Sequence, residues 1–241
     1  MKTLNQYIKE KLIINKDYSG INILAPRTFD ELREIIDDRD DKLGPGTKEN
    51  PIDFNDIDIS HIRSFYNDDG HKGLFDDTFF KYIDISGWDV SNVTNMRCMF
   101  FSCEGLKSVG DISGWNVSNV TDMAYMFTRC ENLNQDISKW GVSSVTDMSY
   151  MFFDCKKFNQ DISKWNVSNV KDMSFMFQYC DSFNQDLSEW DVSKVTDMNG
   201  MFQGCKSFNK DISKWNVSKV KNNILMFLNC PIKEEYKPKF K

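Results

Sequence analysis

The stretch DISKWNVSNVKDMSFMFQYC, residues 161–180, recurs with small changes at a regular interval over much of the chain. The six tryptophans mark the register of these copies, because their residue numbers differ by 27 once and by 25 thereafter. They are Trp88, Trp115, Trp140, Trp165, Trp190 and Trp215. Self-similarity at a fixed period of this size is the signature of repeat architectures, whose stacked units share one core. The sequence therefore predicts an extended repeat array.

Each copy combines two hydrophobic periodicities. Trp165 and Val167 lie two residues apart, which is the spacing of one face of a short strand. The segment 173–180 then places Met, Met, Phe and Cys at i, i+3, i+4 and i+7, the spacing of one helical face. Between them, Ser168 or Asn169 can cap a helix, with Asp172 three residues after Asn169. We therefore expect a short strand, a tight turn and a short helix in every unit.

The pattern W-x-V-S-x-V-x-x-M-x-x-M-F-x-x-C resembles the signature of the BspA-like leucine-rich repeat family over residues 84–230. A strand-plus-helix unit of about 25 residues also lies in the leucine-rich-repeat range. The resemblance implies a right-handed solenoid and, for many members, surface display with adhesion or host interaction. We expect an α/β repeat fold, namely a right-handed leucine-rich-repeat-like solenoid with a helical N-terminal cap.

The composition of the chain changes along its length, and we divide it into four regions. These are a helical N-terminal cap or small assembly module at 1–50, a degenerate first repeat at 51–83, six repeats at 84–230, and a charged C-terminal cap or tail at 231–241. Within the first region, residues 3–14 can form a short amphipathic helix. A second helix is predicted from the Thr28–Glu31 capping box and the apolar stripe that follows it.

Cysteine and aspartate recur with the repeat and invite metal hypotheses. Six of the seven cysteines follow it: Cys103, Cys130, Cys155, Cys180, Cys205 and Cys230. This spacing favours a buried packing position over a disulfide framework, and the paired C-x-x-C spacing of a zinc site is missing. The aspartates Asp84, Asp111, Asp136, Asp161, Asp186 and Asp211 suggest calcium, but each can cap its own turn. We expect neither a metal nor another cofactor.

Charge and hydropathy exclude several classes of partner. The formal net charge of −6 and the pI of about 5.1 argue against nucleic acid, which would require a basic face. No apolar run approaches the roughly 20 residues of a membrane span. Residues 1–20 lack the apolar core of a signal peptide and a cysteine for lipid attachment, so we expect synthesis in the cytoplasm. The family resemblance adds a surface or virion location as an alternative.

The sequence offers little for catalysis. The two histidines, His61 and His71, both lie in the degenerate first repeat, near Asp68 and Asp69. An insertion rich in Asn, Asp and Gly is more typical of a solvated surface turn than of an acid–base loop. No phosphate-binding loop and no nucleophile motif is present in the sequence. We therefore expect a protein that is not an enzyme.

Residues that vary on the constant repeat define two candidate binding surfaces. The helix side carries the aromatic residues Tyr125, Tyr150, Phe175, Phe101, Phe153 and Tyr179. The strand face carries the polar residues Asp89, Asn116, Asn166, Asp191 and Asn216. Aromatic residues are favoured at interfaces, although the same rings can fill gaps between adjacent turns. We expect a non-catalytic module that binds another protein. A self-associating structural component of a cell envelope or phage particle, or a surface adhesin, remains the alternative.

Overall fold

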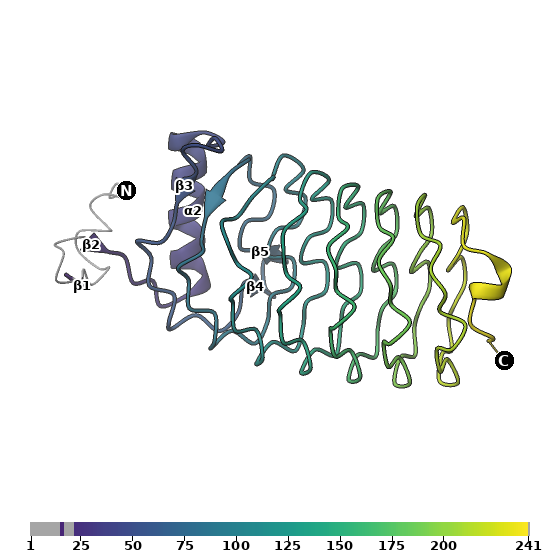
Figure 1. Cartoon of the computed structure of the whole chain (residues 1–241). Helices are drawn as coiled ribbons and strands as arrows, with labels where there is room; N and C mark the ends of the chain where they lie inside the picture. The colour runs from purple at the N-terminus through teal and green to yellow at the C-terminus, as the bar shows by residue number, and fades with distance from the viewer. Residues whose placement is uncertain (1–14, 17–21, 241) are drawn as a thin grey trace.

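The structure is a computed structural model that describes residues 15–16 and 22–240. The chain forms a stack of coils that advances from an N-terminal helix to a short C-terminal tail (Figure 1). One isolated parallel bridge joins each coil to the next, and the bridge recurs at the same position of every repeat. The bridged residues are Ser64, Asn95, Asp122, Asp147, Asp172, Asp197 and Asn222. Successive coils are thus stacked with the equivalent residues of successive repeats side by side.

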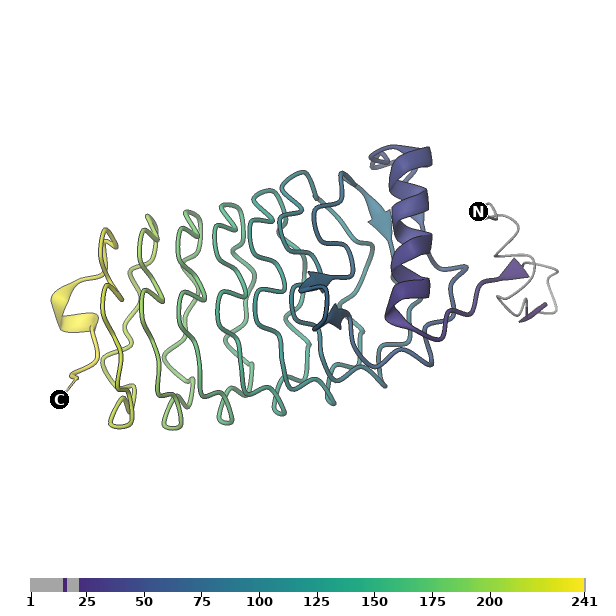
Figure 2. The ribbon, with the colours of Figure 1, turned by 180° about the vertical axis from the view of Figure 1, so that it is seen from behind.

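Regular secondary structure lies mainly at the N-terminal end of the stack. The elements are β1 (Asn15–Lys16), β2 (Asn22–Ile23), α2 (Phe29–Leu43), β3 (Ile52–Asp53), β4 (Tyr66–Asn67), β5 (Lys72–Gly73), β6 (Ile83–Asp84) and the 3₁₀ helix η1 (Glu234–Tyr236). β3 pairs with β6 in parallel, whereas β1–β2 and β4–β5 are antiparallel pairs. Seen from behind, α2 lies along the first coils and η1 lies at the opposite end (Figure 2).

The repeats contain turns at the positions where a short strand and a short helix were expected. Between β6 and η1, a range that the structure describes throughout, the chain forms no further helix or strand. Tyr150 and Asp154 both have a φ of 57°, in the left-handed region. A left-handed residue every fourth position interrupts the right-handed backbone that a helix requires. The chain instead closes successive turns, in which the Met151 N–H donates to the Met148 carbonyl at 3.2 Å.

The coils are held together by backbone hydrogen bonds that run in one prevailing direction. In one coil, four N–H groups donate to carbonyls of the next coil at 2.7–3.0 Å. The donors are Met148, Tyr150, Phe152 and Asp154, and the acceptors are Asp172, Ser174, Met176 and Gln178. The Thr146 N–H donates in the opposite direction, to Thr121. This part of every coil therefore presents N–H groups toward the C-terminal end and carbonyls toward the N-terminal end.

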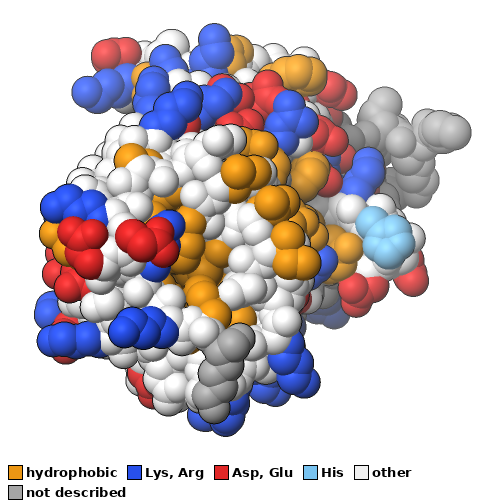
Figure 3. Space-filling model, turned by 90° about the vertical axis from the view of Figure 1, so that its right-hand side faces the viewer, with side chains coloured by type: hydrophobic (Ala, Val, Ile, Leu, Met, Phe, Trp, Pro, Cys, Tyr) orange, Lys and Arg blue, Asp and Glu red, His pale blue; other side chains and the backbone are white. Residues whose placement is uncertain are grey.

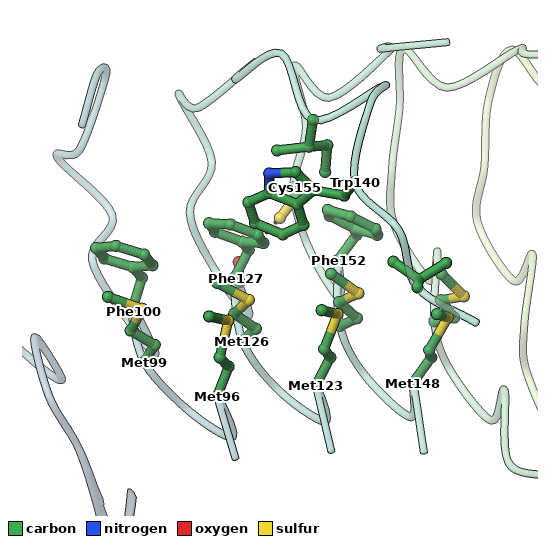
Figure 4. Close-up of a cluster of buried hydrophobic side chains, with 14 of the residues drawn as sticks. Met96, Met99, Phe100, Met123, Met126, Phe127, Trp140, Met148, Phe152 and Cys155 are labelled. Atoms are coloured by element: carbon green, nitrogen blue, oxygen red, sulfur yellow. Dashed lines mark hydrogen bonds between the residues drawn. The ribbon is translucent and has the colours of Figure 1, made fainter. Parts of the chain in front are cut away.

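Equivalent apolar side chains form columns in the core (Figure 4). The rings of Phe100, Phe127 and Phe152 stack nearly parallel, with centroids 5.5 and 5.8 Å apart. The Trp165 indole N–H donates to the Ile137 carbonyl of the preceding coil at 3.1 Å. Each buried aromatic residue removes about 150–250 Å² from water. Stacking thus buries the apolar face that no single repeat could bury alone.

The repeated cysteines are free thiols in this core. Cys155 is buried, and its Sγ donates to the Phe127 carbonyl at 2.9 Å. Equivalent bonds join Cys103 to Phe75 and Cys180 to Phe152. Burial raises the pKa of the Cys103 thiol to about 12, so it remains protonated and can donate. The thiol therefore serves as a packing residue that also satisfies a buried carbonyl.

Helix α2 covers the first coils. Leu32, Ile35 and Ile36 are buried against the core, and the Thr28 hydroxyl accepts the Glu31 N–H at 3.2 Å as the N-cap. The Arg33 guanidinium donates to the carbonyls of Gly73, Leu74 and Asp76 at 2.8, 3.3 and 3.1 Å. It thereby caps the carbonyl edge of the first coil. The helix expected within residues 3–14 lies outside the described residues.

Candidate interaction surface

Three of the predicted aromatic residues form a column on the outside of the stack. Tyr125 and Tyr150 stack with ring centroids 4.5 Å apart and an interplanar angle of 7°, and Tyr150 and Phe175 lie 4.7 Å apart. All three residues are left-handed, with φ between 57° and 60°. They occur once per coil at the same turn position and are half-buried. We call Tyr125, Tyr150 and Phe175 the aromatic column.

The other three predicted aromatic residues contact this column directly or through one another. Phe101 lies 6.4 Å from Tyr125, and Phe153 lies 5.7 Å from Tyr150. Phe153 in turn packs edge-on against Tyr179 at 5.8 Å. Tyr179 is 42% exposed, the largest exposure among the six rings. The structure therefore brings all six residues into one connected aromatic surface.

Both ends of the aromatic column are covered. At one end the Arg97 guanidinium lies over the Tyr125 ring, 4.8 Å from its centroid, and 3.7 Å from the Asp122 carboxylate. At the other end the Phe175 ring lies against Gly200 of the next coil. Ring faces are thus used for packing between coils, which is the gap-filling role that the sequence also allowed. What remains open to a partner is the ridge formed by the ring edges.

A row of carboxylates is adjacent to the column at the bridged positions of the stack. Asp122, Asp147, Asp172 and Asp197 occupy it, one per coil, and each accepts the N–H two residues ahead at 2.8–2.9 Å. Burial raises the pKa of Asp122 and Asp172, and neighbouring carboxylates raise it further. Burial also raises the pKa of the Tyr150 phenol, to which Asp172 and Asp197 add.

The sequence pattern alone did not identify this row as part of the surface. It assigned Asp172 to helix capping, although the Asp-Met pair recurs with the period of the repeat. That recurrence was the feature that could have indicated a continuous row of acids. The row, together with the ring edges, gives this side of the stack an aromatic and acidic character.

The predicted strand-face residues form a separate set, again one per coil. Asp89, Asn116, Asn166, Asp191 and Asn216 are all exposed, and they lie in irregular segments just before a turn, not in strands. Each accepts the N–H of the serine two residues ahead, as Asn166 does from Ser168 at 3.1 Å. The hydrogen bond from Ser91 lowers the pKa of Asp89, and Ser193 does the same for Asp191. Part of their bonding capacity is therefore used within their own turns.

The two histidines and the possible metal ligands were the remaining candidates of the sequence. His61 and His71 are both exposed, and His71 Nδ1 lies 3.3 Å from the Tyr66 hydroxyl. No group of three or more His, Cys, Asp or Glu side chains in the described part of the chain is arranged to hold a metal ion. Among the described helices, none has the length and apolar character needed to cross a membrane.

Comparison with protein families places most of the repeats in a known family. The sequence pattern of the family described as "Mycoplasma protein of unknown function, DUF285" matches residues 71–179 and 158–236, which together span more than half of the chain. The matched ranges include the aromatic column and most of the repeats. Comparisons with curated proteins and with solved structures gave no significant match.

Proposed function

Since the chain belongs to the DUF285 family, whose description names no activity, we propose from its geometry that it is a non-catalytic protein-binding module. In this proposal the stack of coils is a right-handed solenoid of the BspA-like leucine-rich-repeat type. The core residues are nearly constant from coil to coil, whereas the outer positions vary, as Tyr150, Phe175 and Gly200 do at one slot. Repeat scaffolds of this kind usually bind partners through such variable outer positions.

The observation that carries the proposal is the connected aromatic surface around Tyr125, Tyr150 and Phe175. Stacking at 4.5–4.7 Å fixes these rings before any partner arrives. Binding then costs little additional side-chain entropy, which is the usual penalty for ordering an interface. Tyrosine is also enriched among the residues that dominate interface energies, because its ring buries large area while its hydroxyl can hydrogen-bond.

The proposed partner is another protein that packs on the ring edges and meets the neighbouring acids. Tyr179 and Phe153 extend the apolar contact, and the Asp147 and Asp172 carboxylates lie beside it. The net charge of −6 agrees with a partner that is not a nucleic acid. Complementary charge across such a rim would mainly set the rate and specificity of association.

A capture experiment with two matched variants tests this proposal. The first variant, Y125S/Y150S/F175S, removes the aromatic column, and the second, N116S/N166S/N216S, changes three exposed residues of the other set. Both are first compared with the native chain by thermal unfolding. Retention of one specific partner by the native chain and the asparagine variant, with loss in the aromatic variant, supports the proposal. Loss of the partner only in the asparagine variant would instead place the binding site on the strand-face residues. Failure of all three forms to capture any partner would contradict a binding role.

A further inference from the structure

The last coil of the stack ends in a row of backbone donors without acceptors. In the preceding coil the N–H groups of Met198, Gly200, Phe202 and Gly204 donate to the last coil at 2.8–3.0 Å. The equivalent groups of the last coil belong to Asn223, Leu225, Phe227 and Asn229. None of these four N–H groups has an acceptor among the residues that the structure describes. A left-handed φ at Leu225 (60°) and Asn229 (58°) keeps the same turn geometry as in the inner coils.

Exposed apolar side chains surround this row of donors. Ile224, Leu225 and Leu228 are 65%, 47% and 46% exposed, and Figure 3 shows hydrophobic side chains gathered at this end of the molecule. The preceding coil has Asn199, Gly200 and Gln203 at the equivalent positions. The terminal coil is therefore more apolar at these outer positions than the coil that precedes it.

The C-terminal tail covers a different part of the last coil. The Ile212 N–H donates to the Tyr236 carbonyl of η1 at 3.0 Å, so the tail closes the stack on the side of Ile212. Between the tail and the open row lies a hollow of about 380 Å³, lined by Leu225, Leu228, Lys237 and Phe240 among others. The tail thus leaves the donor row open while forming one wall beside it.

The bonding pattern at the two ends excludes a second copy of this chain as the occupant. A row of donors requires a row of carbonyls, and the exposed carbonyl edge of another copy would be its first coil. There Arg33 of helix α2 already donates to the Leu74 and Asp76 carbonyls. Two C-terminal ends placed together would oppose donors to donors. Neither described end of a second copy therefore offers a complementary row of free carbonyls.

We propose that the C-terminal edge of the stack binds a peptide segment of another protein, which adds one further coil. Its backbone carbonyls accept from Asn223, Leu225, Phe227 and Asn229, and its apolar side chains pack on Leu225 and Leu228. This is edge augmentation, in which main-chain hydrogen bonds supply affinity and side-chain pockets supply specificity. The partial positive charge of the donor row favours a segment that carries an acidic residue, whereas Lys237 beside it is already paired with Glu234 at 2.6 Å.

The inner coils indicate which peptide to use as a probe. Gly200 fits beneath the bulky Phe175 because it lacks a Cβ, so a glycine at that slot would also fit beneath Leu225. The probe is the nine-residue peptide of residues 197–205 with C205S, DMNGMFQGS, added to the isotopically labelled full chain. We expect saturable NMR shifts at the amides of the four donors, and none with a scrambled peptide of the same composition.

A variant that restores the preceding coil's residues, L225G/L228Q, removes the apolar contacts at positions where the same backbone already occurs. We expect it to bind the probe roughly tenfold more weakly. F79S, which removes an 81% exposed ring elsewhere, should bind normally. The aromatic variant Y125S/Y150S/F175S should also bind normally, so this test is independent of the proposed function. Equal binding by L225G/L228Q, absence of shifts at millimolar probe, or concentration-dependent dimerisation through the same four amides would overturn the proposal.

Discussion

The ring of Phe175 occupies the space that a side chain on Gly200 would require. A Cβ placed on Gly200 would lie 2.6 Å from both Cδ1 and Cε1 of Phe175, and Gly200 itself has a φ of 58°. Four residues further on, Tyr179 lies over Gly204 in the same way, because a Cβ placed on Gly204 would lie 2.5 Å from Cδ1 of Tyr179. Two glycines of one coil thus accommodate two rings of the preceding coil. This pairing ends the aromatic column without leaving the last ring face open.

We predict that G200A destabilises the protein by about 2–4 kcal/mol, the sum of a backbone cost and a packing cost. A left-handed alanine costs roughly 1–2 kcal/mol, and displacing a packed ring costs about as much again. Chemical denaturation gives the free energy of unfolding. G141A is the matched control, because a Cβ on Gly141 would meet nothing within 4 Å and its φ is not left-handed. A loss no larger for G200A than for G141A would contradict the role of Phe175 at this site.

The indole hydrogen bonds permit a second comparison within one chain. Trp165 donates to Ile137 at 3.1 Å, whereas the buried Trp115 Nε1 has no partner among the described residues. Both substitutions to phenylalanine remove similar packing, but only W165F loses a hydrogen bond, which is worth about 1 kcal/mol. We therefore expect W165F to lower the free energy of unfolding by about 1 kcal/mol more than W115F does. Equal losses would show that the bond contributes nothing net.

The thiols should differ in reactivity according to burial. Cys130, Cys155 and Cys180 are fully buried and hydrogen-bonded, and burial raises the pKa of each. Cys98 and Cys230 are half-buried. Under native conditions we expect iodoacetamide to modify Cys98 and Cys230 first, because the thiolate is the reacting species and must be accessible. Mass spectrometry of digested peptides measures this order, and in denaturant the difference should disappear.

Asp76 should make stability depend on pH. It is 9% exposed, its Oδ1 has no partner among the described residues, and burial raises its pKa from 3.8 to about 6. Because the folded state holds the proton more tightly, this contribution to stability is complete below pH 3.8 and is lost as the pH rises through 6. We expect D76N to remove on the order of 1 kcal/mol of this pH dependence, discounted for partial solvation.

Denaturation curves at pH 4, 5, 6 and 7 would measure the effect of D76N. D69N is the control, since Asp69 lies exposed in the turn of the first coil. If D76N and the native chain showed parallel stability profiles between pH 4 and 7, Asp76 would not be the titrating group.

The sequence indicates the register and the core of this protein well. The positions of Trp165, Val167, Met173 and Cys180 follow from the period of the repeat, and all four are buried. Burial can be predicted here because one inward position recurs in every copy and tolerates little variation. Tyr125, Tyr150 and Phe175 also share one surface, since equal slots in successive coils must lie side by side, and the other three aromatic candidates join it through ring contacts.

The local backbone was less predictable. The Met, Met, Phe and Cys spacing of residues 173–180 suits a helix as well as it suits a chain of turns, and only the left-handed φ of Phe175 and Tyr179 distinguishes them. Such a φ is uncommon for aromatic residues and is stabilised here by stacking with the neighbouring coils, a tertiary effect. Gly200 and Gly204 at the same slots were the local evidence for it. The acidic row around Asp172 was missed because it, too, arises only when neighbouring coils are stacked.

The consistent direction of the inter-coil hydrogen bonds gives the molecule an electrical polarity along its length. Four forward N–H groups per coil outnumber the backward ones, so peptide dipoles add from coil to coil, as they do along a helix axis. The end near Arg33 is then the negative pole, which suits the cation that caps it, and the last coil is the positive pole. Each added repeat moves the two poles further apart, whereas the charge that each end attracts is set by the unpaired N–H or carbonyl groups of its own terminal coil.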